Sequence, residues 1–253
     1  MMINRQITFI IQARLASTRL PGKIIRPFYK QESIIQLLLK KLKQYDSCKV
    51  ILATSTDESN DRLVQIADEE KVICYRGSEN DVLQRFIEAA ASINAQRIIR
   101  VCSDNPFLNE QAIETLLKVS ENSSADYISF LVNGSPSIKT HFGFWTEYVT
   151  LNALKQVREL TNENLYHEHV TNYIYTHPES FQIEWLPTPE CLCNRNDIRL
   201  TCDTQSDFQN AQSIYEHIID HSPHPTIEEV VHYIDAHPEY LNSMRTQIQQ
   251  NTK

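Results

Sequence analysis

Apolar residues follow two spacings along this chain, and the spacings predict strands and helices in turn. Short runs of β-branched and aromatic residues predict buried strands at 7–11, 50–53, 72–75, 97–102 and 126–130. Apolar positions three or four residues apart predict amphipathic helices at 33–42, 61–70, 81–94 and 110–120. This alternation indicates an α/β fold whose parallel sheet is covered by helices on both faces. Ligands bind such sheets beyond the carboxyl ends of the strands, so the loops there form the candidate site.

The second half of the chain is less regular. Glycine and proline interrupt the pattern between residues 133 and 148. Beyond it the pattern predicts further helices and strands, with helices at 151–159, 167–175, 206–219 and 226–236 and strands at 181–186 and 198–202. The polar stretch after Tyr240 predicts a tail that frays. We therefore expect one domain over residues 1–240 and a polar tail at 241–253.

Composition and charge narrow the classes of function. The chain has 253 residues, 41% of them hydrophobic, which suffices for one large core. A net charge of −8 argues against general nucleic-acid binding, which requires a basic surface. No secretory signal is visible, and no stretch reaches the roughly 20 apolar residues of a membrane span, so we expect a cytoplasmic protein. The six cysteines are then expected to be thiols, because disulfides are rare in that compartment.

The segment Gln12–Lys23, directly after the first strand, has the composition of a phosphate-binding loop. It gathers three cations, two hydroxyl side chains and one of only four glycines, namely Arg14, Arg19, Lys23, Ser17, Thr18 and Gly22. A triphosphate requires cations, hydrogen-bond donors and a turn that admits the backbone closely. It is not a Walker loop, because Ile24 follows Lys23 where that motif requires Ser or Thr. The alternative is a solvated basic loop with a Pro-Gly turn.

Two aspartates follow predicted strands on the ligand side of the sheet. Asp104 comes after the strand at 97–102, and Asp203 after the strand at 198–202. Mg²⁺ prefers oxygen ligands and commonly takes one or two carboxylates plus phosphate oxygens, so we expect both aspartates to hold it. The alternatives are an Asx turn at Asp104 and a helix cap at Asp203.

Four other charged residues are candidates for the same cleft. Arg76, Asp81 and Arg85 are expected to contact the ligand or to brace its loop. Arg85 follows Asp81 by four residues, so a simple ion pair on one helix face is the alternative. Arg100 is expected to reach a carboxylate or phosphate of a second substrate, or to pair with Asp104.

Five segments of the chain carry a combined pattern, namely Gln12–Lys23, Arg76–Arg85, Arg100–Pro106, Glu168–Thr171 and Arg199–Thr204. Together they resemble the cytidylyltransferase family, most closely its SpsF-like branch of spore coat polysaccharide proteins. These segments occur in the family's order, and the resemblance as a whole covers residues from about 7 to 236. The stretch from His141 to Glu147 departs from the branch's pattern, which places the nature of the acceptor in question more than the nucleotide.

The resemblance implies a fold and a reaction. The fold is a single Rossmann-like, GT-A-like domain, usually a homodimer, with an acceptor and dimerisation region at about 133–189. The reaction transfers CMP from CTP to an acidic or phosphorylated sugar-like acceptor, with Mg²⁺ and release of pyrophosphate, for surface polysaccharide biosynthesis.

The resemblance also implies roles for individual residues. The triphosphate would be held by Arg14, Ser17 and Lys23, with the backbone at Gln12 and Ala13 near the cytosine, and Arg14, Lys23 and Asp104 would be catalytic. The acceptor would contact Arg100, Glu147, Glu168 and His169.

Two other functions remain open from the sequence. One is a GT-A glycosyltransferase that uses a nucleotide sugar; its usual D-x-D is not present in Asp104-Asn105-Pro106. The other is a non-catalytic nucleotide-binding protein. The base preference comes from the resemblance alone, and the identity of the acceptor cannot be derived from residue spacing.

Overall fold

A mixed sheet forms the centre of the protein, and the computed structural model describes residues 6–251. Its strand order is β10-β7-β9-β6-β1-β4-β5, with β8 paired to β7. The strands are β1 (Ile7–Gln12), β4 (Lys49–Ser55), β5 (Ile73–Gly77), β6 (Arg97–Cys102), β7 (Tyr127–Val132), β8 (Ser135–Pro136), β9 (Glu147–Thr150) and β10 (Ile183–Leu186). The pairs β1–β4, β1–β6, β4–β5 and β7–β10 are parallel, which confirms the predicted α/β class with a mainly parallel sheet.

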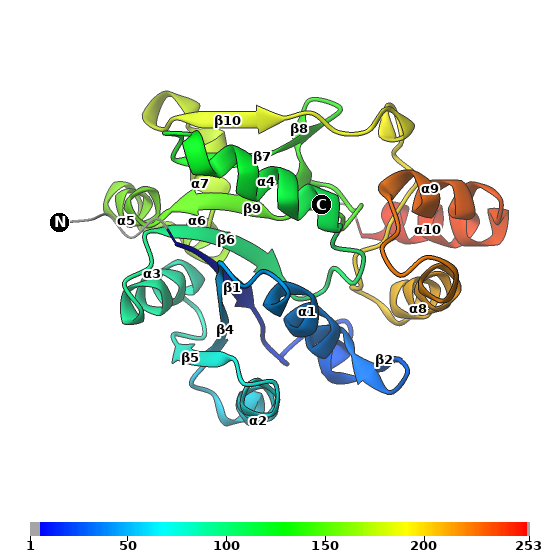
Figure 1. Cartoon of the computed structure of the whole chain (residues 1–253), viewed down its shortest axis with the longest axis horizontal. Helices are drawn as coiled ribbons and strands as arrows, with labels where there is room; N and C mark the ends of the chain where they lie inside the picture. The colour runs from blue at the N-terminus through cyan, green and yellow to red at the C-terminus, as the bar shows by residue number, and fades with distance from the viewer. Residues whose placement is uncertain (1–5, 252–253) are drawn as a thin grey trace.

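Helices cover both faces of this sheet (Figure 1). The α-helices are α1 (Ile34–Lys43), α2 (Asp61–Glu69), α3 (Val82–Ser92), α4 (Glu110–Asn122), α5 (Leu151–Leu160), α6 (Asn164–Glu168), α7 (Asn172–Thr176), α8 (Gln205–His221), α9 (Ile227–Asp235) and α10 (Pro238–Gln250). In β1, Ile10 packs into the core beneath α3 and α5, whereas Phe9 and Ile11 pack into the core beneath α1 and α4. This alternation follows from the two-residue period of a strand.

Short 3₁₀ helices and a hairpin complete the fold. The 3₁₀ helices are η1 (Lys23–Ile25), η2 (Glu58–Asn60), η3 (Ser137–Lys139), η4 (Pro178–Ser180) and η5 (Glu190–Leu192). The hairpin pairs β2 (Pro27–Tyr29) with β3 (Glu32–Ser33). Within residues 6–251, no helix has both the length and the apolar character that crossing a bilayer requires.

Three sequence predictions about the second half of the chain were wrong: the strand at 198–202, the single helix at 167–175 and the frayed tail after Tyr240. Residues 198–202 form no strand; Leu200 N–H donates to the His141 carbonyl and Cys202 N–H to the Asp104 carbonyl, so loops replace a strand partner. The single helix expected at 167–175 is two short helices, α6 and α7, separated at 169–171.

The tail expected to fray after Tyr240 is largely helical. Helix α10 begins with Pro238, a residue whose fixed φ suits the first helical turn, and it buries Leu241 and Met244. It packs against α8 and α9, so burial of these side chains outweighs the polar composition that suggested disorder.

The irregular stretch 133–148 also contains structure that the pattern did not reveal. Strand β9 lies between β6 and β7 and runs antiparallel to both. Glu147 is its first residue and is paired across the sheet with Arg100 of β6. The insertion of β9 therefore brings an acid from the irregular region against the parallel sheet.

Candidate active site

The loop after β1 is folded by its own backbone and by η2. Gly22 N–H donates to the Leu15 carbonyl at 3.1 Å, which closes the loop, and Gly22 adopts φ +67°, a conformation that favours glycine. The Leu15 N–H donates to Oδ1 of Asn60 at 2.8 Å, and Asn60 Nδ2 donates to Ser55 Oγ at 2.8 Å. The buried Asn60 thus ties the loop to the end of β4, and η1 starts at Lys23 directly after the turn.

Lys23 joins the two aspartates. Its Nζ lies 3.0 Å from Asp104 Oδ2 and 3.2 Å from Asp203 Oδ1. Burial lowers the pKa of Lys23, but the two carboxylates raise it by more, so the net shift is above its ordinary value and the ammonium is charged. The structure therefore brings the loop after β1, the end of β6 and the segment before α8 to one point.

Asp203 is held from several sides. Arg199, a fully buried side chain, donates from Nη2 to Asp203 Oδ2 at 3.0 Å and makes a two-point contact with Asp207 at 2.8 and 3.0 Å. Asp207 in turn accepts hydrogen bonds from the backbone N–H groups of Asp203 and Thr204. Arg19 Nη2 lies 3.1 Å from Asp203 Oδ1. The Asp203 carboxylate is therefore fixed by cations before any ligand binds.

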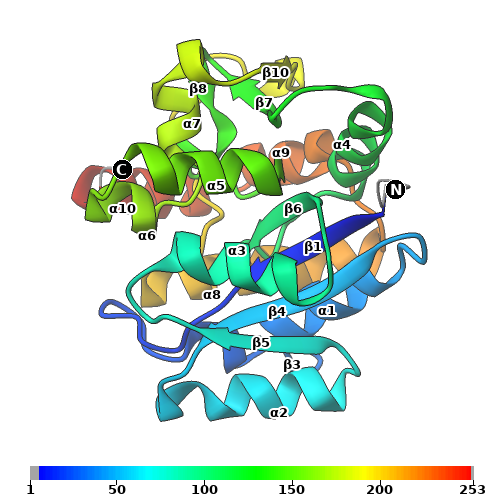
Figure 2. The ribbon, with the colours of Figure 1, turned by 90° about the vertical axis from the view of Figure 1, so that its left-hand side faces the viewer.

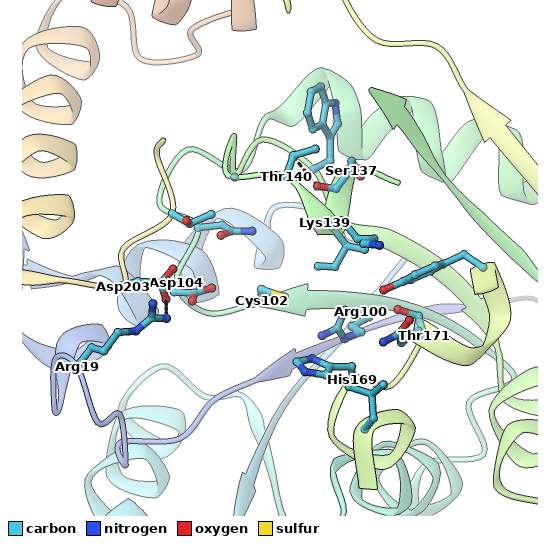
Figure 3. A pocket seen from close by; sticks show the side chains of 18 residues that line it. Arg19, Arg100, Cys102, Asp104, Ser137, Lys139, Thr140, His169, Thr171 and Asp203 are labelled. Carbon is cyan, nitrogen blue, oxygen red and sulfur yellow. Dashed lines mark hydrogen bonds and ion pairs between the residues drawn. The ribbon is translucent and has the colours of Figure 1, made fainter. Parts of the chain in front are cut away.

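A cavity of about 470 Å³ opens beside this cluster (Figure 3). Asp104, Asp203 and Arg19 border one part of it, and Arg100, His169 and Thr171 border another (Figure 3). Its further lining residues are Cys102, Asn105, Ser137, Ile138, Lys139, Thr140, Gly143, Trp145, Leu165, Asn172, Tyr175 and Thr201. Acids, cations, hydroxyls and aromatic rings thus share one space, as a pocket for a polar molecule requires.

Arg100 reaches the cavity from a buried network. Its Nη1 lies 2.6 Å from Glu147 Oε2, and its Nη2 donates to Gln12 Oε1 at 3.2 Å. Glu147 also accepts hydrogen bonds from the hydroxyls of Tyr127 and Thr171. The buried Nε of Arg100 has no hydrogen-bond partner within the described residues. Since an orphaned buried donor is costly, Nε is suited to donate to a bound anion.

Two more polar atoms at the cavity wall lack protein partners among residues 6–251. They are Oδ1 of Asn105 and Oγ1 of Thr201, both buried. A Cβ at Gly143 would lie 3.5 Å from Asn105 Oδ1 and 3.5 Å from Thr201 Cγ2. Asn105 follows Asp104 directly, and Thr201 lies two residues before Asp203. The atoms near the two carboxylates that could bind a metal ion are therefore mostly oxygens. That chemistry fits Mg²⁺, which prefers oxygen ligands and retains several waters.

Comparison with known proteins gives one family. The family model described as cytidylyltransferase matches residues 8–232. The spore coat polysaccharide biosynthesis protein SpsF of Bacillus subtilis is 32% identical over 216 residues, or 83% of this chain and 86% of that protein. The chain belongs to the cytidylyltransferase family.

Solved structures agree with this cytidylyltransferase assignment. A cytidylyltransferase of Leptospira borgpetersenii superposes with a TM-score of 0.79 at 26% identity, covering 93% of this chain and 96% of that one. A CMP:2-keto-3-deoxy-manno-octonic acid synthetase in complex with CTP gives 0.64 at 14% identity, covering 84% and 99%, which supports the fold alone. The chain is accordingly a nucleotidyltransferase with the GT-A-like fold that the sequence predicted.

The cytidylyltransferase site contains some of the predicted residues directly. Asp104, Asp203, Arg100 and His169 line the cavity, and Lys23 pairs with the two acids. Glu147 lies behind Arg100 and is buried, outside that lining.

The other predicted residues of the loop and of α6 lie around the site. The Arg14 side chain is exposed and its Nη2 lies 3.3 Å from Glu168 Oε1. Ser17 shapes the loop, since its Oγ accepts from the Leu20 N–H at 3.4 Å. Gln12 faces Arg100, and the neighbouring Ala13 is buried and donates its N–H to the Ala53 carbonyl.

Arg76, Asp81 and Arg85 form a second group, outside the cavity lining. Arg76 donates to the carbonyls of Ser55 and Asp57, so it braces the segment after β4. Asp81 caps α3 by accepting from the Gln84 N–H at 2.8 Å, and it also bonds His167 Nδ1 at 2.8 Å.

Arg85 is fully buried, whereas the alternative of a simple ion pair with Asp81 would place its side chain on the surface of the helix. Its Nη1 donates to the Ser78 carbonyl, and its Nε and Nη2 have no hydrogen-bond partner within the described residues. Burial lowers its pKa.

Sequence reasoning missed several residues that build this site. Arg19 was recognised as a cation of the loop but not as a cavity residue, and Asn60 was not recognised at all. Thr204 and Asp207 form a capping box at the start of α8, a spacing that could have been read from the sequence. The contacts of Tyr127 and Thr171 with Glu147 have no local sequence signal, because they join distant segments.

Proposed function

We propose that this protein transfers CMP from CTP to an acidic or phosphorylated sugar-like acceptor and releases pyrophosphate, for surface polysaccharide biosynthesis. The observation that carries the proposal is the convergence of Lys23 with Asp104 and Asp203 at the edge of the cavity. The name of the Bacillus subtilis relative supports polysaccharide biosynthesis, and the synthetase that was solved with CTP supports the choice of nucleotide.

The proposed cofactor is Mg²⁺, held by Asp104 and Asp203. When bound, it would neutralise charge on the phosphates during displacement. Both carboxylates contact the same cation, the Lys23 ammonium, so they lie close enough together to bind one metal ion between them. If the two carboxylates held the metal ion, the Lys23 ammonium would be available to contact a triphosphate bound at the loop after β1.

The protein's own residues supply alignment and charge for an in-line attack on the α-phosphorus. We propose that Arg14, Ser17, Arg19 and Lys23 hold the triphosphate from the loop after β1. The group of Arg76, Asp81 and Arg85 lies beyond the cavity lining, and we propose that it contacts the nucleotide or braces the loop that holds it.

The acceptor is proposed to occupy the cavity itself. Arg100, Lys139 and His169 offer positive charge or hydrogen-bond donors there, and Ser137, Thr140 and Asn172 offer groups suited to sugar hydroxyls. Trp145 and Tyr175 provide aromatic surface. This lining suits a small polar molecule with an anionic group better than an apolar one.

The family match favours nucleotidyl transfer over the alternative of a glycosyltransferase that uses a nucleotide sugar. Thermal-shift measurements distinguish the two, since CTP with Mg²⁺ should raise the melting temperature more than UDP-sugars do. A non-catalytic binding protein would show that CTP shift but no turnover with any acceptor.

The direct test is pyrophosphate release. The protein is incubated with each of the four nucleoside triphosphates, Mg²⁺ and a panel of acidic and phosphorylated sugars. We expect release with CTP and at least one acidic acceptor, and a loss of about 10²–10³-fold in the Asp104→Asn variant. Release that is independent of the acceptor, or a preference for another triphosphate, would contradict the proposal.

A further inference from the structure

Helix α10 lies outside residues 8–232, the part of the chain that the family model matches, yet it contacts the active site. Figure 1 shows it in red beside α8 and α9. Its polar side chains reach several points of the segment 197–210, which carries Asp203. These contacts join Arg245 to Asp197 at 2.9 Å, Gln247 to Thr204 at 3.0 Å, and Ser243 to Ser206 at 3.1 Å and Asn210 at 2.7 Å.

The contact of Gln247 lies next to Asp203. The Thr204 hydroxyl donates to Gln247 Oε1 and accepts from the Asp207 N–H at 3.1 Å. A hydroxyl with both its proton and a lone pair committed has one rotational setting. The backbone N–H groups of Asp203 and Thr204 both donate to Asp207. Gln247 therefore completes the set of hydrogen bonds that fixes the backbone beside Asp203.

Asn251, the C-cap residue directly after α10, holds the Arg19 side chain. Asn251 Oδ1 accepts from Arg19 Nη1 at 3.1 Å, while Arg19 Nη2 contacts Asp203 Oδ1 at 3.1 Å. Asn251 is itself anchored, since its Nδ2 donates to the Gln247 carbonyl at 3.0 Å. Arg19 is half exposed, and a long exposed side chain loses rotamer freedom when it is fixed. Asn251 pre-orders this side chain at the cavity before a ligand binds.

We propose that α10, together with Asn251 at its C-cap, is a positioning element of the active site, in which Gln247 sets the Asp203 segment and Asn251 sets Arg19. The inference rests on the proposed function, because the ligand that Asp203 and Arg19 meet is taken to be the triphosphate with its metal ion. Neither Gln247 nor Asn251 lines the cavity, so each acts through the residue that it holds.

The test compares four variants of the full chain. Gln247→Leu removes the acceptor for Thr204, Gln247→Glu keeps an acceptor oxygen, and Asn251→Ala releases Arg19. Gln249→Ala is the matched control, an exposed residue in the same helical turn. Each variant is assayed for melting temperature, for affinity toward CTP with Mg²⁺ by calorimetry, and for kcat and KM.

The two variants are expected to differ in the quantity that each changes most, although Gln247 Oε1 also accepts from Asn251 Nδ2 at 3.4 Å. A net hydrogen bond corresponds to a change of about 3- to 10-fold. Asn251→Ala should weaken CTP affinity by about that factor, and Gln247→Leu should lower kcat by a similar factor. Gln247→Glu should recover most of that loss, and Gln249→Ala should match the wild type.

Two outcomes would overturn the inference. One is wild-type affinity and kcat in both Gln247→Leu and Asn251→Ala, which would mean that α10 only packs against α8 and α9. The other is equal loss in Gln247→Leu, Gln247→Glu and Gln249→Ala, which would indicate general destabilisation of the helix. If the wild type itself fails to bind CTP, the proposed function fails instead, and the binding measurement on the wild type distinguishes that case.

Discussion

Lys23 is the residue on which the chemistry of the site depends most. Its ammonium lies between Asp104 and Asp203, and Lys23 is the last residue of the loop that is expected to hold the triphosphate. The Lys23→Met variant keeps a stem of similar length but loses the charge, so Asp104 would lose its cation partner, whereas Asp203 would keep its contacts with Arg199 and Arg19.

We expect Lys23→Met to lower kcat/KM for CTP by about 10²–10³-fold, the typical effect of removing one donor of transition-state charge stabilisation. Pyrophosphate release at varied CTP concentration measures it. The melting temperature serves as the control for folding. A change in kcat/KM below about threefold would show that the ammonium has a structural role only.

The pair of Arg100 and Glu147 allows a prediction about stability. Glu147→Gln keeps the shape that the Tyr127 and Thr171 hydroxyls contact but leaves the Arg100 charge buried and without its carboxylate. Breaking a buried ion pair on one side costs about 3–5 kcal/mol of unfolding free energy. Denaturant titration should show this loss, and much of it should return in the double variant Arg100→Met with Glu147→Gln. Additive losses in the double variant would contradict the account.

At the scale of elements, η2 is predicted to hold the phosphate loop in place. Asn60→Ala removes the acceptor for the Leu15 N–H, a partly buried hydrogen bond, and the donor to Ser55 Oγ, a buried one. Leaving such a buried group unsatisfied costs about 1–3 kcal/mol of unfolding free energy. We expect a matching loss in denaturant titration together with weaker CTP binding. Asn60→Asp, which keeps the acceptor for Leu15, should lose less, and equal losses in the two variants would contradict the role assigned to that hydrogen bond.

The contact between α6 and the start of α3 is predicted to depend on pH. Burial lowers the pKa of His167, but its hydrogen bonds to the Asp81 carboxylate and the Thr161 carbonyl raise it by more, so the net shift is upward. A raised pKa in the folded state stabilises the fold most below the ordinary value of 6.5 and loses this contribution as the pH rises through the folded pKa.

The difference in melting temperature between wild type and His167→Asn should therefore shrink as the pH is raised from about 5 to about 9. Asp81→Asn should remove most of the pH dependence of that difference. A difference that stays constant across the range would show that protonation of His167 does not contribute.

The first half of the fold could be predicted because its elements carry strong local patterns. The strands at β1, β4, β5, β6 and β7 are short apolar runs, and the helices between them are amphipathic. The second half could not be predicted fully, because β9 pairs with strands distant in sequence and 198–202 bonds to loops. Helix α10 was missed because its apolar residues are few and their effect depends on α8 and α9.

The whole molecule brings the site together from segments that are far apart along the chain. Lys23 and Asp104 come after β1 and β6, and their meeting follows from the parallel pairing of these two strands. Asp203 was predicted to follow a strand, but a loop that bonds to His141 and Asp104 brings it to the same place. The partners behind them, such as Arg199 with Asp207 and Glu147 with Tyr127, required the folded chain. In Figure 2, β1 and β5 run toward the side of the molecule on which α6 and α10 lie. Both helices are therefore on the side where the carboxyl ends of these strands lie.

The proposed homodimer is a prediction at this scale as well. Two of the large apolar side chains that are exposed within residues 6–251, Leu160 and Leu165, lie at the end of α5 and in α6. We expect light scattering to give twice the mass of one chain and Leu160→Glu to shift it toward the monomer. A monomer for the wild type at all concentrations would contradict this prediction.

The most direct test of the whole account is a crystal structure of the protein with CTP and Mg²⁺. We expect one metal ion held by the carboxylates of Asp104 and Asp203 and by a phosphate oxygen, with the Lys23 ammonium on the triphosphate and the neighbouring cavity left for the acceptor. A triphosphate bound away from the loop that precedes Lys23, or a metal ion held by other residues, would contradict it.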